Sequence, residues 1–232
     1  MPSPAPFNAL LFGLSGCLVD FGARAPSLAL QRLGPEADVE RDLQQWLGSA
    51  SPQAQQAYLQ ALCEVADELS EATPGTLPLL QQLQEQGLRC AWLDELPRDA
   101  ALRMAQALPD WLPGISAQRL RPWPAPDSLW QALMQLQVEK LEGCVLISGE
   151  PRLLQAGLNA GLWTIGLATC GTLCGLALGD WQSLDRLRRD QLRSQATLNL
   201  YRLGVHSVID QLTELPACLA DLALRRNKGE KP

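Results

Sequence analysis

The sequence predicts an α/β fold: a Rossmann-like parallel sheet sandwiched by helices, with a small α-helical cap inserted after the first strand. Short apolar runs alternate along the chain with longer segments of helical apolar spacing, which is typical of βαβ units. The first apolar run, residues 9–12, turns at the sequence GLSG (13–16) and the stretch ends on Asp20. Because an open α/β sheet binds its ligand beside such a turn, residues 8–20 also predict where the site lies.

Between this stretch and residue 136, the sequence predicts four helices and two further strands. Apolar residues at helical spacing predict helices over 23–33, 76–86, 98–108 and 127–136. The first of these stops at Gly34-Pro35 and the second at Gly87, because both signals terminate helices. Apolar runs predict strands over 88–93 and 115–120.

The second half continues the alternation. We expect strands over 144–148, 162–167 and 205–209, and helices over 152–160, 183–203 and 216–224. The strand at 144–148 leads into Gly149-Glu150, a second polar turn at the carboxyl end of a strand. The tail after residue 224 is rich in charge, and we expect it to be frayed.

A change of composition marks an insert. Glutamine and alanine become frequent over residues 36–71, in two helical runs that Ser49 to Pro52 separate. The return to the sheet is marked by the turn signal Thr73-Pro74-Gly75. The domain prediction is therefore a core of residues 1–21 and 73–232 with a reduced helical cap at 22–72.

Composition excludes several classes of partner. The 232 residues are 47% hydrophobic and carry a net charge of −6, so no basic face argues for nucleic acid. No apolar run reaches the roughly 18 residues that a membrane span needs. The first residues lack the pattern of a signal peptide. We therefore expect a cytoplasmic protein without nucleic-acid or membrane partners.

Thiols and histidine offer little metal chemistry. The 7 cysteines are an odd number in apolar surroundings, so buried free thiols are the expectation. Cys170 and Cys174 form the only close pair, a weak signal for a metal or redox site. The single histidine, His206, excludes a histidine cluster for zinc and is expected to be structural.

Four segments carry a resemblance to a known family. They are FGLSGCLVD (12–20), RPWP (121–124), LNAGLWTIG (158–166) and GVHSVIDQLTEL (204–215). In this order the chain resembles the haloacid-dehalogenase (HAD) superfamily, and within it the phosphonoacetaldehyde hydrolase family. The first segment corresponds to the family motif FDxxGTxxD and the second to RPxP. The resemblance covers nearly the whole chain except the insert.

The resemblance implies a defined chemistry. An aspartate at the end of the first strand attacks phosphorus and forms an aspartyl-phosphate. That aspartate, a backbone carbonyl and an aspartate of the fourth motif hold Mg2+. A hydroxyl after the second strand and a Lys or Arg of the third motif bind the phosphoryl oxygens. In the phosphonate-cleaving branch, a lysine in the cap forms a Schiff base with the aldehyde.

The first motif has lost its reactive residue. The nucleophile position is Gly13, which offers neither a nucleophile nor a metal carboxylate. Ser15 stands two residues on, Gly16 is the motif glycine, and Cys17 replaces the motif threonine. Asp20 remains, and in the family this residue is chiefly structural.

The later motifs are degenerate too. After the second strand, Leu93 and Asp94 stand where the family has a hydroxyl and small residues. The bulk of Leu93 and the negative charge of Asp94 disfavour phosphate binding. In the fourth motif, Gly149-Glu150, only Glu150 is a candidate ligand, because the second aspartate has become Leu153 or Leu154. The insert has no Schiff-base lysine, because the first lysine in the chain is Lys140. We expect no intact catalytic residue, metal site or cofactor.

Several residues have two interpretations. Arg121, the cation of the third motif, binds a small anionic ligand or pairs with an acid such as Glu150. Asp94, Glu95 and Glu150 form a relocated cation site or, as we favour, are solvated acids. Cys17 is a reactive thiol or, as we favour, a small apolar filler. Trp46 and Tyr58 are either a homodimer surface or the core of the insert.

The leading functional hypothesis is a phosphonoacetaldehyde hydrolase-like HAD protein that has lost phosphoryl transfer and acts as a ligand-binding or assembly module. The alternatives are a hydrolase with rebuilt chemistry on an unknown phosphate or phosphonate substrate, and a structural partner that dimerises through the cap. The sequence identifies neither the ligand nor the pathway. The shape of the cleft above Gly13 distinguishes these functional hypotheses. A cleft filled by Trp92, Leu93 or Trp123 excludes a role that requires a bound small molecule.

Overall fold

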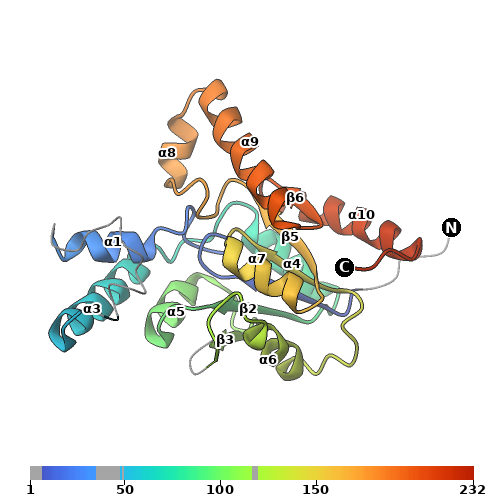
Figure 1. Cartoon of the computed structure of the whole chain (residues 1–232), viewed down its shortest axis with the longest axis horizontal. Coiled ribbons are helices and arrows are strands. Elements are labelled where there is room, and N and C mark those ends of the chain that lie inside the picture. The colour runs from blue at the N-terminus through green and yellow to red at the C-terminus, as the bar shows by residue number, and fades with distance from the viewer. Residues whose placement is uncertain (1–6, 35–47, 49, 117–119) are drawn as a thin grey trace.

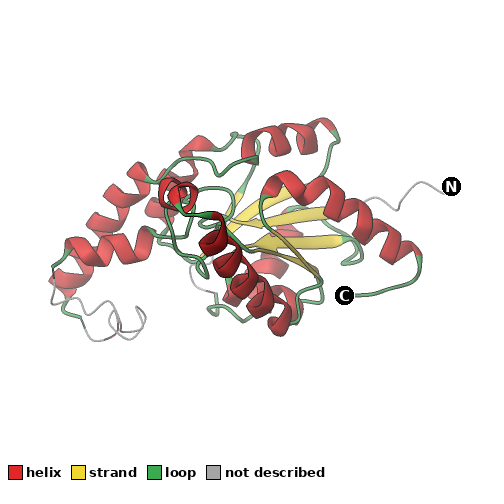
Figure 2. Ribbon diagram, turned by 90° about the horizontal axis from the view of Figure 1, so that it is seen from above, coloured by secondary structure: helices red, strands yellow, loops and turns green. Residues whose placement is uncertain are grey.

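The protein is a single parallel sheet covered by helices on both faces (Figures 1 and 2). The computed structural model describes residues 7–34, 48, 50–116 and 120–232. The strands are β1 (Ala9–Gly13), β2 (Cys90–Asp94), β3 (Gly114–Ser116), β4 (Cys144–Ser148), β5 (Trp163–Leu167) and β6 (Ser207–Ile209). They are parallel in the order β3-β2-β1-β4-β5-β6, so the predicted fold class is confirmed.

The helices of the described residues follow the predicted order with some differences. They are α1 (Ala25–Arg32), α3 (Pro52–Glu68), α4 (Thr76–Glu85), α5 (Arg98–Met104), α6 (Asp127–Gln135), α7 (Pro151–Asn159), α8 (Leu178–Ser183), α9 (Arg186–Leu203) and α10 (Leu215–Asn227). Short 3-10 turns lie at Ala105–Ala107 and Leu212–Glu214. The helix predicted over 98–108 therefore ends its α-helical part at Met104.

The two faces of the sheet are covered by different helices because side chains alternate along a strand. Leu10 and Phe12 of β1 share one cluster with α4 and α10. Leu11, between them, packs with residues of α6 and α7 on the other face. All five residues of β1 are buried, so the continuous apolar run reflects burial on both faces.

Two predictions at the carboxyl-terminal end of the chain were wrong. The single helix over 183–203 is interrupted at Leu184, where the backbone is extended (ψ 146°), and α8 precedes the break. α9 begins afresh because the Asp185 side chain accepts a hydrogen bond from the Arg188 N–H at 2.8 Å. The expected frayed tail is helical to Asn227, because Arg225 donates to the carbonyl of His206 and to Glu230.

The insert stands beside the carboxyl ends of the strands. α1 and α3 pack against each other on one side of the sheet (Figure 1). The Ser51 hydroxyl accepts a hydrogen bond from the Ala54 N–H and caps α3. The first helical run predicted for the insert, including Trp46, lies outside the described residues. Within the described part of the chain, no helix is long and apolar enough to cross a bilayer.

Candidate functional site

The carboxyl ends of β1, β2 and β4 meet where the strand order reverses. Gly13, the last residue of β1, lies opposite Leu93 of β2 in the register of the sheet. β4 runs on the other side of β1 and ends at Ser148. A cavity of about 400 Å³ lies over this point, between the sheet and the insert. This volume is in the range of ligand pockets, and the position is where α/β sheets bind ligands.

Gly13 leaves no room for the side chain that the resemblance requires. A Cβ built on it would lie 2.7 Å from Ser148 Oγ and 3.5 Å from Leu153 Cδ2. The Ser148 hydroxyl is itself held in place, because it accepts the Glu150 N–H at 2.9 Å. The space next to Gly13 is thus filled by the hydroxyl of a neighbouring strand.

Ser15 links two carboxylates that sequence reasoning treated separately. Its backbone N–H donates to Asp94 Oδ2 at 3.1 Å, and its hydroxyl donates to Asp20 Oδ2 at 2.8 Å. Asp20 also accepts from the N–H groups of Arg24 and Ala25 at the start of α1. Asp20 is therefore a structural residue that joins the turn after β1 to the insert, as predicted.

Asp94 acts as an internal anion in the turn. Its second oxygen accepts the Leu96 N–H at 2.9 Å, so both oxygens are held by backbone donors. Desolvation by burial is the largest effect and raises the pKa of Asp94 to about 6, although these hydrogen bonds oppose the shift. Asp94 therefore holds the turn after β1 to the end of β2 through the Ser15 N–H.

One wall of the cavity is a linked group of three residues. Glu95 accepts the backbone N–H of Trp123 and a hydrogen bond from Arg152 Nη1 at 3.0 Å. Arg152 Nη2 also donates to the carbonyl of Trp123. Leu93 and Trp123 line the cavity without filling it, and Trp92 lies among buried residues away from it. The cleft is therefore open.

Arg152 is a site residue that the sequence interpretation missed. Its position on the first turn of α7, directly after Gly149-Glu150-Pro151, was the signal available. Arg121, which was expected there, is not among the residues that line the cavity. It is paired with Asp127, with Nε to Oδ1 at 3.0 Å, and its side chain is 70% exposed. Of the two interpretations of Arg121, the structure therefore has the pairing with an acid, and that acid is Asp127 at the start of α6 in place of Glu150.

Glu150 caps α7 and faces the cavity. Its Oε1 accepts the Arg152 N–H at 3.0 Å. Burial raises the pKa of Glu150, opposed by this bond and by a hydrogen bond with the Thr172 side chain. No group of three or more His, Cys, Asp and Glu residues in the described chain could hold a metal ion. Asp94, Glu95 and Glu150 are accordingly not arranged as such a group in the described part of the chain.

The two motif glycines serve close backbone packing. Gly16 has φ +67°, and a Cβ on it would lie 2.8 Å from the Cβ of Ala23. A Cβ on Gly149 would lie 2.5 Å from both Gly16 O and Gly171 Cα. Gly171 belongs to this contact and was not singled out from the sequence. The three glycines allow the loops after β1, β4 and β5 to approach one another.

The cysteines are fillers, as we favoured for Cys17. Cys17 is fully buried, its Sγ lies 3.5 Å from the carbonyl of Ile147, and burial raises its thiol pKa. A raised pKa is the opposite of what a reactive thiol needs. Cys170 and Cys174 are both free, and burial raises their pKa values to about 12 and 11.

The insert contributes an apolar wall. Tyr58 and Leu59 of α3 line the cavity together with Pro26 of α1. Tyr58 is 2% exposed and packs in the hydrophobic core, which agrees with its interpretation as a core residue of the insert. His206 is structural: its Nδ1 accepts the Thr164 N–H at 3.0 Å and its ring packs on Trp163.

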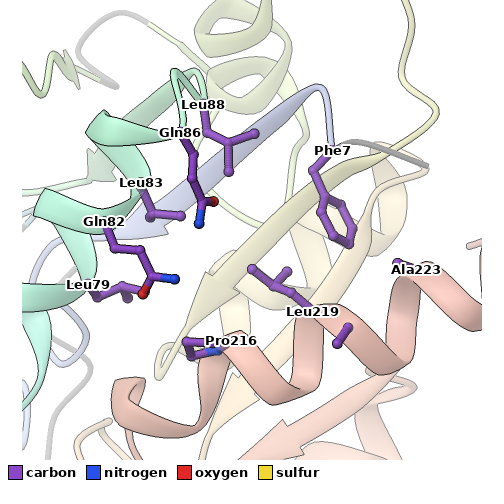
Figure 3. Close-up of a pocket in the computed structure, with 10 residues that line it drawn as sticks. Phe7, Leu79, Gln82, Leu83, Gln86, Leu88, Pro216, Leu219 and Ala223 are labelled. Carbon is purple, nitrogen blue, oxygen red and sulfur yellow. The ribbon is translucent and has the colours of Figure 1, made fainter. Parts of the chain in front are cut away.

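A second hollow, of about 470 Å³, lies between α4 and α10 (Figure 3). Phe7, Leu83 and Leu219 point into it, and the described residues that line it carry no charge. Phe7 and Leu88 precede β1 and β2, so this hollow is toward the amino ends of the strands. It offers no acid–base chemistry.

The residues at the family's Mg2+ positions do not fit the ion. Gly13 has no carboxylate, and the fourth-motif position is taken by Leu153, which is fully buried and lines the cavity. Leu154 points to a different cluster, with Ala196 and Leu200 of α9. Hard cations such as Mg2+ need oxygen ligands, and these positions supply only Glu150.

Comparison with known proteins agrees with this fold. No protein-family model matches the chain. Phosphonoacetaldehyde hydrolase of Bordetella pertussis is 27% identical over 269 aligned residues, which cover 99% of this chain and 97% of that protein. The alignment is longer than this chain of 232 residues, so the relative contains segments that are absent here.

Solved structures give the same result. One crystal structure has 51% sequence identity and a TM-score of 0.77, and covers 97% of this chain and 100% of that chain. A phosphonoacetaldehyde hydrolase-like protein from Oleispira antarctica has 22% identity and a TM-score of 0.89, and the match covers 99% of this chain and 97% of that chain. A HAD family hydrolase from Deinococcus radiodurans R1, with bound phosphate and sodium, has 23% identity and a TM-score of 0.63. This match covers 95% of this chain and 98% of that chain. Fold, motif order and full-length similarity together place the chain in the HAD superfamily as a phosphonoacetaldehyde hydrolase-like protein.

Proposed function

We propose that this protein has lost phosphoryl transfer and uses the cavity above Gly13 to bind a ligand, with the insert acting as its cap. The observation that carries the proposal is the arrangement at the end of β1. The nucleophile position is a glycine with Ser148 Oγ against it, and the Ser15 N–H is taken by Asp94. The position at which the resemblance requires a nucleophile therefore offers no reactive side chain, and the backbone donor beside it is engaged within the protein.

Electrostatics support the proposal. The described residues around the cavity include the carboxylates of Asp94, Glu95 and Glu150 but one cation, Arg152. That cation is already neutralised by Glu95 at 3.0 Å. A phosphate or phosphonate dianion would meet like charges within a partly desolvated site, where repulsion is stronger than in water.

The test is an assay of phosphate release. The purified protein is incubated with Mg2+ and phosphonoacetaldehyde, and separately with p-nitrophenyl phosphate. The Bordetella pertussis relative serves as positive control. We expect no inorganic phosphate above the buffer control, because removing a covalent nucleophile costs several orders of magnitude in rate.

If phosphate release were detected, a matched pair of variants would show whether it comes from this cavity. Mg2+-dependent phosphate release that is lost in Glu150→Gln but kept in Glu142→Gln would disprove the proposal. Glu142 is an exposed acid in the loop before β4, outside the cavity lining, so its replacement removes the same charge without touching the site.

A second candidate is an enzyme with rebuilt acid–base chemistry, and the state of Asp94 favours it. A carboxyl with a pKa of about 6 in a cavity is suited to proton transfer near neutral pH. The two backbone N–H groups that hold Asp94 argue for a structural role instead. An activity whose pH profile has an acid limb near 6, and which Asp94→Asn abolishes, would favour this candidate.

A further inference from the structure

The cavity above Gly13 has a chemical character opposite to that of a phosphate site. Its described lining has three carboxylates and one guanidinium, and most of the remaining wall is apolar. The apolar part includes Tyr58 and Leu59 of α3, Leu93 of β2 and Leu153 of α7. A pocket of about 400 Å³ with this wall accommodates a small organic molecule with an apolar body.

Two donors on the cavity wall already serve acceptors of the protein itself. The Ser15 N–H donates to Asp94, and the Arg152 guanidinium donates to Glu95 and to the carbonyl of Trp123. Because Glu95 offsets the charge of Arg152 at 3.0 Å, an anionic ligand would meet the repulsion of the three carboxylates without a free cation to balance it.

Acceptor capacity, in contrast, remains at Glu150. Its carboxylate accepts the Arg152 N–H and interacts with the Thr172 side chain. An ionised carboxylate has about four acceptor positions, so Glu150 can accept further hydrogen bonds. Burial disfavours its charged form, and a cation bound beside it would relieve that penalty.

We propose that this cavity binds a primary amine with a short apolar tail, whose ammonium group is held by Glu150. The tail would lie against Leu59 and Leu153, and the ammonium would donate to the free acceptor positions of Glu150. The inference rests on the proposed loss of phosphoryl transfer and adds the class of ligand.

The test uses four probes by isothermal titration calorimetry at neutral pH: n-hexylamine, hexan-1-ol, sodium hexanoate and inorganic phosphate. We expect hexylamine to bind more tightly than hexanol, and hexanoate and phosphate not to bind. Glu150→Gln should weaken hexylamine at least about tenfold and leave hexanol unchanged, because a charge-assisted hydrogen bond is lost. Glu142→Gln should leave all four titrations as in the wild type.

A second variant keeps the test decisive if Glu150→Gln is unstable. Leu59→Ala, on the part of the wall that α3 supplies, should weaken hexylamine and hexanol by the same factor. Phosphate or hexanoate binding more tightly than hexylamine would overturn this inference, whereas only phosphate release in the assay above would overturn the proposed function. Absence of binding by every probe, together with absence of phosphate release, would overturn the inference alone.

Discussion

The backbone N–H of Ser15 donates to the carboxylate of Asp94 at 3.1 Å, across 79 residues of sequence. This bond ties the turn after β1 to the end of β2. It places a carboxylate of the protein itself on a backbone donor of a residue that lines the cavity.

Asp94→Asn should change the pH dependence of stability. The folded pKa of Asp94, about 6, lies above the ordinary aspartate value of 3.8, so the native state binds more protons between these values. The contribution of Asp94 is therefore present at low pH and is lost as the pH rises through about 6. We expect Asp94→Asn to become more stable relative to the wild type by about 1–3 kcal/mol between pH 4 and pH 7. Urea unfolding at a series of pH values measures this, and a difference that is constant with pH would contradict it.

Gly13→Asp should not restore phosphate release. The new side chain meets Ser148 Oγ and Leu153, and the metal carboxylate of the fourth motif is still absent. We expect destabilisation of about 1–3 kcal/mol from overpacking. Gly13→Ala with Ser148→Ala should show favourable coupling in a double-mutant cycle, because the second change removes the nearest atom. Additive effects in urea unfolding would show that Ser148 does not fill this space.

Arg152 and Arg121 form a matched pair of arginines. Arg152→Met removes hydrogen bonds to Glu95 and Trp123, and should cost about 1–3 kcal/mol because Glu95 keeps the Trp123 N–H but loses the cation that balances its charge. Arg121→Met breaks an exposed pair with Asp127 and should cost at most about 1 kcal/mol. Chemical denaturation compares the two, and an equal loss would mean that Arg152 is no better held than a surface arginine.

Two neighbouring residues of α3 have different roles: Tyr58 packs in the core, and Leu59 lines the cavity. Tyr58 is 2% exposed, so Tyr58→Ala should destabilise by about 3–5 kcal/mol through loss of core packing. Leu59 is 43% exposed, so Leu59→Ala should cost less than about 1 kcal/mol while it weakens hexylamine binding. Thermal melts and calorimetry separate the two effects. Strong destabilisation by Leu59→Ala would place Leu59 in the core rather than on the cavity wall.

Some features could be predicted from the sequence because they depend on local chemistry. A run of apolar residues must be buried, so all six strands and the switch point beside β1 were predicted. Helix boundaries were less accurate where capping decided them, as at Asp185, whose side chain starts α9 three residues after the predicted beginning.

The sequence by itself determined the absence of a nucleophile at Gly13, because a glycine has no side chain in any fold. Only the tertiary structure decided which groups fill and surround the site. Ser148 against Gly13, Asp94 on Ser15, and Arg152 in place of Arg121 all depend on how loops from different strands are oriented. Those orientations are set by packing between segments far apart in the chain, such as the close contact of Gly16, Gly149 and Gly171. No pattern within a single segment encodes them.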